Sequence, residues 1–332
     1  MSDVGCLAAA QPPAQPGCVP GSRPPAFRVS RHSPLATRRA FSLIEILVVI
    51  GLLSVIILGL LMMFNQTQKA FRIGMTQTDV LEGGRMTTEL MARELEQMTP
   101  SYLNQWRYGT PTPNFYAGVV QNFSTQTLPA NINPRTNVFE DVFFLTRQNQ
   151  TWTGIGYFVR TNDASGNLGV PANGFGTLYR FSTNYSVSQF ATNAGLMITN
   201  FLLARLSGNA SGVSKIVDGV VDFKIRAYNT NGIGINPANP NWVFPFNSVS
   251  NIQASFPTAG TAGEVPSYYF YSNAVPSSVE LEIGILEQAT LQRLQSIPAF
   301  AAQANYFANQ AGHVQLFRQR VAVRTVDPSA YQ

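Results

Sequence analysis

The longest apolar run of the chain extends from Leu43 to Phe64 and contains one ionisable side chain, Glu45. An α-helix rises ~1.5 Å per residue, so this run would cover ~33 Å, which is the thickness of a bilayer's hydrocarbon core. A carboxylate in such a segment costs roughly 2.5–3.5 kcal/mol on insertion scales. The pattern therefore predicts a membrane-spanning helix over residues 41–64, with an acid that needs a specific reason to be there.

The helical pattern continues beyond the apolar run. No proline occurs between Phe64 and Pro100, and apolar or small residues recur at steps of three and four. These positions are Leu81, Gly84, Thr88, Met91, Leu95 and Met98. Glu89 and Arg93 are spaced to form an i,i+4 ion pair. We expect residues 65–99 to form an amphipathic half of the same helix, which would run from Phe41 to Met98.

Two adjacent glycines, Gly83 and Gly84, interrupt this half. Each weakens a helix by ~1 kcal/mol relative to alanine. They could form a flexible joint, or they could allow a sheet to approach the helix closely. We favour the close contact.

Beyond Pro100 the chain is rich in β-branched and aromatic residues between Gly, Asn and Pro turns, which is typical of strands. The predicted strands are 138–146, 153–160, 177–182, 216–228, 279–286 and 318–324. Residues 161–176 would close a long hairpin, 288–295 and 299–310 are predicted helices, and 196–206 fits either helix or strand. Alternation along the later strands predicts half-exposed antiparallel strands. The fold class is therefore α+β, with a long N-terminal α-helix packed on an antiparallel β-sheet domain over residues 100–332.

Charge is concentrated before the apolar run. The chain carries a net charge of +5. Most of it comes from five arginines in residues 1–40, namely Arg23, Arg28, Arg31, Arg38 and Arg39. Arginines on one side of a span favour the cytoplasmic side, so the C-terminal domain is expected to face outward. The rest of the chain is nearly neutral and offers no electrostatic support for a nucleic-acid partner. Residues 1–40 are also proline-rich, which predicts a disordered leader.

Cysteine and histidine usage limits the possible chemistry. Cys6, Cys18 and His32 all precede the apolar run, and His313 is the remaining histidine. Disulfides, thiol nucleophiles and zinc clusters are therefore not expected in the domain, and a histidine-based triad would depend on one residue. No phosphate-binding glycine motif with a following lysine occurs. We expect no enzyme and no cofactor.

Two groups of carboxylates need a separate interpretation. Glu280 and Glu282 lie two residues apart on a predicted strand and share one face, with Glu287 nearby, and we interpret them as a solvated face and not as an acid–base pair. Asp163–Asn167 offers oxygen ligands at alternate positions, as a calcium loop does. The twelfth position from Asp163 is Gly174, where a bidentate Glu is needed, so we expect no metal site.

The segment Arg38-Arg39-Ala40-Phe41-Ser42-Leu43-Ile44-Glu45 resembles the prepilin signature of type IV pilins and type II secretion pseudopilins. The resemblance implies that a prepilin peptidase cuts between Ala40 and Phe41, that Phe41 becomes N-methylated, and that Glu45 is the fifth mature residue. The family usually has glycine before the cut, where this chain has Ala40. An uncleaved signal anchor is the alternative. A secretory signal peptide fits less well because its apolar core would be shorter.

A physical argument accompanies this resemblance. Cleavage would create an α-amino cation at Phe41, one helical turn from Glu45, and N-methylation would keep its charge. In a filament, the amine of an incoming subunit could pair with Glu45 of a subunit already in place. Two buried charges would then neutralise each other.

The order of the later strands resembles the larger minor pseudopilins, with the J-type minor pseudopilin and the W-type minor pilin nearest. This implies a pilin-like fold and a single-pass protein of the inner membrane that faces the periplasm and later enters a filament. The implied partners are the prepilin peptidase, other pilin or pseudopilin subunits, membrane lipid, and an assembly platform driven by a separate ATPase.

Three classes of function remain to be compared. A structural filament subunit, at the tip or in priming assembly, is the main prediction. The alternative is a membrane-anchored periplasmic binding module that captures secreted protein, DNA or a surface. A periplasmic enzyme is the third and least supported class. The long loop 229–265 contains Trp242, Phe244 and Phe246. These aromatics could contact a partner, or they could anchor the loop on its own domain.

Overall fold

The computed structural model describes residues 42–107, 109–120, 124–126, 135–163, 165–208, 210–235, 251–255 and 267–331. The chain divides into two units, residues 1–62 and residues 63–332. In the first unit, the described residues are helical from Leu43 onward. The second unit contains the rest of that helix and the β-sheet domain.

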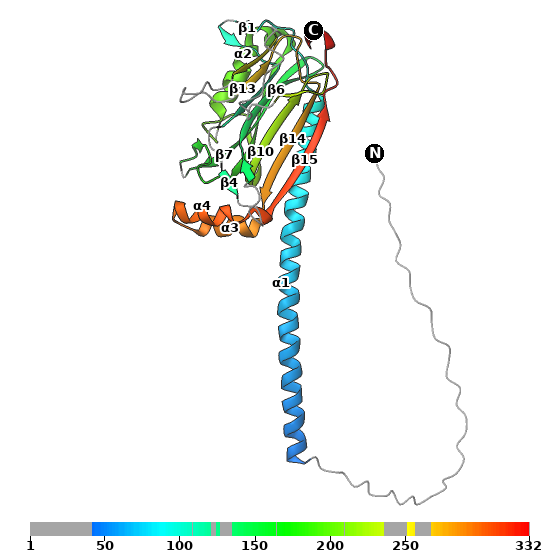
Figure 1. Cartoon of the computed structure of the whole chain (residues 1–332), viewed down its shortest axis with the longest axis vertical. Coiled ribbons are helices and arrows are strands. Elements are labelled where there is room, and N and C mark those ends of the chain that lie inside the picture. The colour runs from blue at the N-terminus through cyan, green and yellow to red at the C-terminus, as the bar shows by residue number, and fades with distance from the viewer. Residues whose placement is uncertain are drawn as a thin grey trace, which may run out of the picture. The chain divides into compact units, whose positions relative to one another are not determined.

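Figure 1 shows the elements along the chain. The helices are α1 (Leu43–Glu96), α2 (Val187–Ala204), α3 (Gln288–Ser296) and α4 (Phe300–Ala308), with 3-10 turns η1 (Ala311–His313) and η2 (Pro328–Tyr331). The strands are β1 (Trp106–Arg107), β2 (Thr110–Pro111), β3 (Phe115–Val119), β4 (Ser124–Gln126), β5 (Arg135–Asn137), β6 (Glu140–Gln148), β7 (Thr151–Asn162), β8 (Leu168–Gly169), β9 (Gly176–Ser186), β10 (Val213–Tyr228), β11 (Gly234–Ile235), β12 (Ile252–Ser255), β13 (Ser267–Phe270), β14 (Ser278–Leu286) and β15 (Val314–Ala322).

The long N-terminal helix is confirmed over the 54 residues of α1. It ends two residues before the predicted end, because Gln97 forms a turn and Met98 forms a β-bridge with Thr146. The carbonyl of Met98 also accepts a hydrogen bond from the hydroxyl of Thr325. The chain thus leaves the helix by joining the sheet, just before Pro100.

Within the second unit, the last turns of α1 pack on one face of the sheet. Met91 and Leu95 are fully buried there, as predicted. Leu81 is 49% exposed, which contradicts its predicted core position. The preceding residue, Val80, is buried instead, at 9% exposure. The buried face of α1 therefore begins one residue earlier than the pattern predicts.

Ion pairs also fix the end of α1. Glu94 accepts hydrogen bonds from the Arg180 guanidinium, the shortest at 2.7 Å, and one from the Tyr157 hydroxyl. The prediction of a Glu89–Arg93 ion pair is wrong. Glu89 pairs instead with Arg85, one helical turn towards the N-terminus, at 2.8 Å. That pair is exposed, so its contribution to stability is small.

Gly84 lies directly against the sheet. A Cβ at this position would be 2.2 Å from the ring of Phe317 on β15, whereas a Cβ at Gly83 would meet no heavy atom within 4 Å in the described part of the chain. The helix continues through both residues. Close helix–sheet contact therefore explains Gly84, as we favoured, and does not explain Gly83.

We expect Gly84→Ala and Gly83→Ala to change stability in opposite directions. The first forces the Phe317 ring to move and should lower the free energy of unfolding by about 1–3 kcal/mol. The second adds a better helix former in open space and should raise it by up to about 1 kcal/mol. Denaturant unfolding of both variants tests this, and equal effects of the two substitutions would contradict the contact.

Among the described residues, eleven strands form one antiparallel sheet. Its main path runs β12-β13-β3-β6-β7-β9-β10-β14-β15, with β8 paired to β7 and β11 paired to β10. The predicted hairpin across residues 161–176 is confirmed, since β7 pairs with β9 from Thr151↔Ser186 to Arg160↔Thr177. Two small ladders, β1-β2 and β4-β5, lie outside this sheet.

The sheet curls so that strands distant in this order approach each other. β6 and β10 are separated by β7 and β9 in the order. Nevertheless Phe139, next to β6, bridges to Phe223 of β10, and the backbone N–H of Phe223 donates to the carbonyl of Val138 at 2.8 Å. The curl encloses the largest apolar cluster, which Met91 and Leu95 of α1 and the following Met98 complete.

The opposite face of the sheet is covered by α2. Its buried residues recur at steps of three and four and meet the aromatic side chains of β6, β7 and β9. They are Phe190, Ala194, Gly195, Met197, Ile198, Phe201 and Ala204. The ambiguous segment 196–206 is therefore mostly helical, and the helix begins earlier, at Val187. β14 is largely buried instead of half-exposed as predicted. Its inner side chains join the core that contains α1, and on its other face Glu280 is covered by its partners Arg226 and Arg318 from the two neighbouring strands.

The predicted helices 288–295 and 299–310 are confirmed as α3 and α4, which lie together at the lower end of the sheet in Figure 1. Leu291, Leu294 and Phe307 anchor them against Leu286 and Phe175. In the loop predicted at 229–265, residues 229–235 end in β11 and residues 251–255 contain β12. Trp242, Phe244 and Phe246 lie outside the described residues.

Candidate functional site

The start of α1 is fixed by its own first residues. Ser42 precedes the helix, and its side-chain oxygen accepts a hydrogen bond from the backbone N–H of Glu45 at 3.3 Å. The Ser42 carbonyl accepts from the N–H groups of Glu45 and Ile46. Ser42 with Glu45 three residues later has the spacing of a capping box, in which the acid also reaches back to the cap. The sequence analysis missed this local role, although the spacing is visible in the sequence.

Of the predicted processing and assembly residues, the structure describes only Glu45. Arg38, Arg39, Ala40 and Phe41 lie outside the described residues. Glu45 is exposed in the first turn of α1, where an acid interacts favourably with the helix dipole. Pairing of Glu45 with an α-amine at Phe41 stays a prediction.

The apolar side chains that follow Glu45 are exposed along the helix, for example Leu47 at 63% and Leu53 at 54%. Among the described residues, α1 is the one helix long and apolar enough to cross a membrane, by length and composition. The hydroxyl of Ser54 donates to the carbonyl of Ile50 at 2.8 Å, so this polar group is satisfied within the helix. Glu45 remains as the one ionisable group between Leu43 and Phe64.

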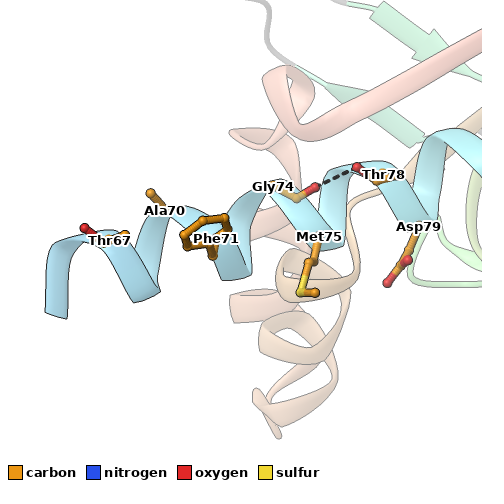
Figure 2. A pocket seen from close by; sticks show the side chains of 7 residues that line it. All are labelled: Thr67, Ala70, Phe71, Gly74, Met75, Thr78 and Asp79. Atoms are coloured by element: carbon orange, nitrogen blue, oxygen red, sulfur yellow. Dashed lines mark hydrogen bonds between the residues drawn. The ribbon is translucent and has the colours of Figure 1, made fainter. Parts of the chain in front are cut away.

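A second exposed apolar surface follows on α1, in the unit that contains the sheet. A groove of about 660 Å³ extends along one face of the helix from Thr67 to Asp79, and Figure 2 shows the side chains that line it. Phe71 and Met75 are 68% and 69% exposed. The hydroxyl of Thr78 donates to the carbonyl of Gly74 at 2.9 Å, which leaves the groove mainly apolar. We call this surface the α1 groove.

The carboxylates of β14 form a largely buried ion network, which corrects the predicted solvated face. Glu280 is 7% exposed and accepts hydrogen bonds from Arg226, Arg318 and Tyr228. Burial alone would raise the pKa of Glu280, but the hydrogen bonds from Tyr228 and Arg318 outweigh it and lower the pKa. Glu282 lies 3.5 Å from the Lys224 ammonium. Each acid is therefore held by cations, an arrangement that favours stability over proton transfer.

The remaining candidate groups are also explained by local contacts. His313 lies 2.9 Å from Glu287 in an exposed position. The Asp163 carboxylate accepts the backbone N–H groups of Ser165 and Asn167, both at 2.8 Å, so it closes its own loop. The hydrogen bonds from Asn167 lower the pKa of Asp163. Within the described residues, no group of three or more His, Cys, Asp or Glu side chains could hold a metal ion.

Three buried acids were not predicted from the sequence: Glu140, Asp141 and Asp222. Glu140 is 2% exposed and accepts the backbone N–H of Ile225 at 2.7 Å, across the curl of the sheet. Burial raises its pKa to about 8, with a smaller rise from the nearby Asp222, against the lowering effect of the Ile225 hydrogen bond and the Lys224 charge. Its place at the start of the predicted strand 138–146 does not reveal this partner.

Comparison of the chain with protein-family models, with curated proteins and with solved structures found no match. The functional interpretation therefore depends on the chain's own residues and on the resemblance of its N-terminal motif.

Proposed function

We propose that this chain is a minor pilin or pseudopilin: a pilin-like structural subunit that is inserted into the inner membrane, cut by a prepilin peptidase and assembled into a filament. In this proposal residues 1–40 are cytoplasmic and the sheet domain is periplasmic. The filament is of the type IV pilus or type II secretion kind, with this subunit at its tip or in priming assembly.

The observation that supports the proposal most is the composition of α1. Its first part exposes apolar side chains and contains a single acid in the first turn, while its last part is buried in the core of the sheet domain. A simple membrane anchor requires neither feature. An acid in lipid is costly, so it is expected to have a partner, and a freshly cut α-amine at Phe41 would supply one.

The α1 groove supports the same proposal. Phe71 and Met75 follow the predicted membrane span and expose apolar surface, which is unfavourable in water. Ala70 and Gly74 are small, so another helix could approach closely. The proposed occupant is the corresponding helix of a neighbouring filament subunit. Extraction of the helix from the membrane into the filament would be driven by an assembly platform with a separate ATPase.

The test of the proposal is the mass of the N-terminus of the membrane-inserted protein, produced together with a prepilin peptidase. We expect a mature chain that begins at methylated Phe41. Ala40→Phe should reduce the processed fraction at least about tenfold, because a pocket fitted to a small side chain rejects a large one. Phe41→Leu serves as the matched control and should be processed nearly normally.

Two results would contradict the proposal. The first is a protein that keeps its first forty residues in the presence of an active peptidase, as an uncleaved signal anchor would. The second is equal processing of the two variants, which would show that the peptidase does not recognise the small side chain of Ala40.

The second candidate function, a membrane-anchored periplasmic binding module, is favoured by one observation. The sheet domain contains a pocket with an excess of positive charge, which lies far along the sequence from the α1 groove. Binding in this pocket would not depend on filament assembly.

A further inference from the structure

A pocket of about 570 Å³ opens where β3, β6 and β7 meet the residues that follow α2. Asp141, Arg160 and Arg205 line its polar side, together with Tyr116. Apolar side chains line the rest, including Leu168, Val170 and Leu206. Val170 and Leu206 are exposed, so the pocket has an apolar rim open to solvent.

The polar side of the pocket is built around Asp141. Arg160 donates to both of its carboxylate oxygens, at 2.9 and 2.6 Å. Arg205 donates to one of the same oxygens at 2.6 Å. The Asp141 side chain is 1% exposed and the Arg160 side chain 6%, whereas the Arg205 side chain is 23% exposed. Arg205 is therefore the cation that a molecule entering the pocket can reach.

The charges of this cluster do not balance. Arginine stays protonated in proteins, so two cations face one carboxylate. Asp141 is the only acid among the described residues that line the pocket. The Val159 carbonyl accepts from Arg160, and the Leu202 carbonyl accepts from Arg205 at 3.5 Å. The rings of Phe158 and Phe201 lie 5.5 and 5.7 Å from the guanidinium carbons of Arg160 and Arg205. These partial charges offset an unpaired cation much less than a carboxylate would.

The alternative is that water alone solvates the excess charge at Arg205. This alternative leaves the shape of the site without a role. A Cβ at Gly118 would be 2.4 Å from the Tyr116 hydroxyl, so the glycine leaves room for this hydroxyl, and both residues line the pocket. Burial raises the pKa of Tyr116, which therefore stays a neutral hydrogen-bond donor beside the two arginines.

We propose that this pocket binds a carboxylate that is attached to an apolar group. The guanidinium of Arg205 would bind the carboxylate oxygens. The Tyr116 hydroxyl, which interacts with Arg205, would donate to them, and the apolar group would contact Leu168 and Val170. A carboxylate carries one negative charge, which matches the single excess positive charge of the cluster. A phosphate dianion would leave negative charge beside Asp141, so it fits less well.

Two sources share this chemistry: a free apolar acid, and the C-terminal carboxylate of a polypeptide. Titration calorimetry on the full chain in a neutral detergent distinguishes them. Butyrate is the first probe and butyramide its uncharged control. A tripeptide of apolar residues with a free C-terminus, and the same tripeptide amidated, are the second pair. Inorganic phosphate is the competing anion.

We expect saturable binding of butyrate and at least tenfold weaker binding of butyramide. Tighter binding of the free tripeptide than of butyrate identifies a polypeptide as the source, and weaker binding identifies a small acid. Both results support the carboxylate site. Absence of binding by butyrate and by the tripeptide, or tighter binding of phosphate than of either, would overturn it.

Substitutions locate the binding in the pocket. Arg205→Ala should weaken binding of the better carboxylate probe at least tenfold, because the accessible cation is lost. Arg147→Ala is the matched control, since it removes an exposed arginine that lies over Trp152, away from the pocket. Arg205→Lys keeps the charge that Asp141 needs for folding but loses the planar pair of donors, and should bind several-fold more weakly. Equal affinities of the Arg205 and Arg147 variants would overturn the assignment.

Discussion

Glu45→Ala is expected to leave membrane insertion unchanged and to reduce entry into filaments by about a hundredfold or more. In the proposed filament, the α-amine of an incoming subunit meets Glu45 in a setting without water. Loss of one partner leaves the other charge buried alone, at a cost of roughly 3–5 kcal/mol. The measurement is the amount of protein in sheared or purified filaments, relative to the amount in the membrane.

Glu45→Gln separates the two roles that the structure allows for this residue. Glutamine can replace glutamate in a capping box with Ser42, but it cannot neutralise an amine. If pairing with the amine is required, the Gln variant should fail as the Ala variant does. Recovery of assembly by glutamine would show that Glu45 acts only in the helix cap, and would contradict the pairing.

Glu82→Ala serves as the control for this series. Glu82 is an exposed acid on the same helix, outside the apolar run. Its loss changes the net charge of the chain by the same amount and should leave assembly unchanged. A similar defect in this variant would point to a general charge effect.

The second large effect concerns Glu140 and pH. The pKa of Glu140 is about 8 in the folded protein, against an ordinary value of 4.5. Between these values the folded state binds more protons at Glu140 than the unfolded state does. The contribution of Glu140 to stability is therefore greatest below pH 4.5 and falls as pH rises to about 8. The shift corresponds to a loss of up to about 5 kcal/mol in the free energy of unfolding.

Glu140→Gln should remove this part of the pH dependence. The amide oxygen can still accept the N–H of Ile225, but it has no charge to bury. The free energy of unfolding of the variant, minus that of the original chain, should therefore increase from pH 5 to pH 8.5. Denaturant unfolding of the full chain in a neutral detergent measures this difference.

A constant difference across that pH range would contradict the assignment. It would mean that Glu140 is ionised in the folded protein at pH 5, with the nearby Lys224 and Arg226 offsetting its burial. The expected result would show that a neutral Glu140 helps to hold the curl of the sheet, because its hydrogen bond with Ile225 joins β6 to β10.

Local patterns in the sequence predicted much of the fold. The predicted elements include the helix from Leu43 to Glu96, the β7–β9 hairpin and the strands β6, β10, β14 and β15. Each is long enough for its repeat of apolar positions to be recognised in the sequence. The short strands were missed. β3 has five residues and β13 has four, too few for an alternation to be distinguished from a turn.

In the candidate site, too, local features were predictable and contacts between distant residues were not. The apolar run and its single acid could be recognised in the sequence, and so could the cap at Ser42. The solvated interpretation of Glu280 was wrong, because its partners Arg226 and Arg318 come from two other strands. The register of those strands cannot be read from the neighbours of Glu280.

By itself, the sequence determined the membrane-length helix, its isolated acid, the α+β class and the order of the main strands. These properties depend on residues within a few turns of one another. The tertiary structure decided which charges are buried together: Asp141 with Arg160 and Arg205, and Glu140 with Ile225, which is 85 residues away. The Glu140–Ile225 contact forms only when the sheet curls, and Arg205 reaches Asp141 only from the end of α2, because these polar groups find partners that are distant in the chain.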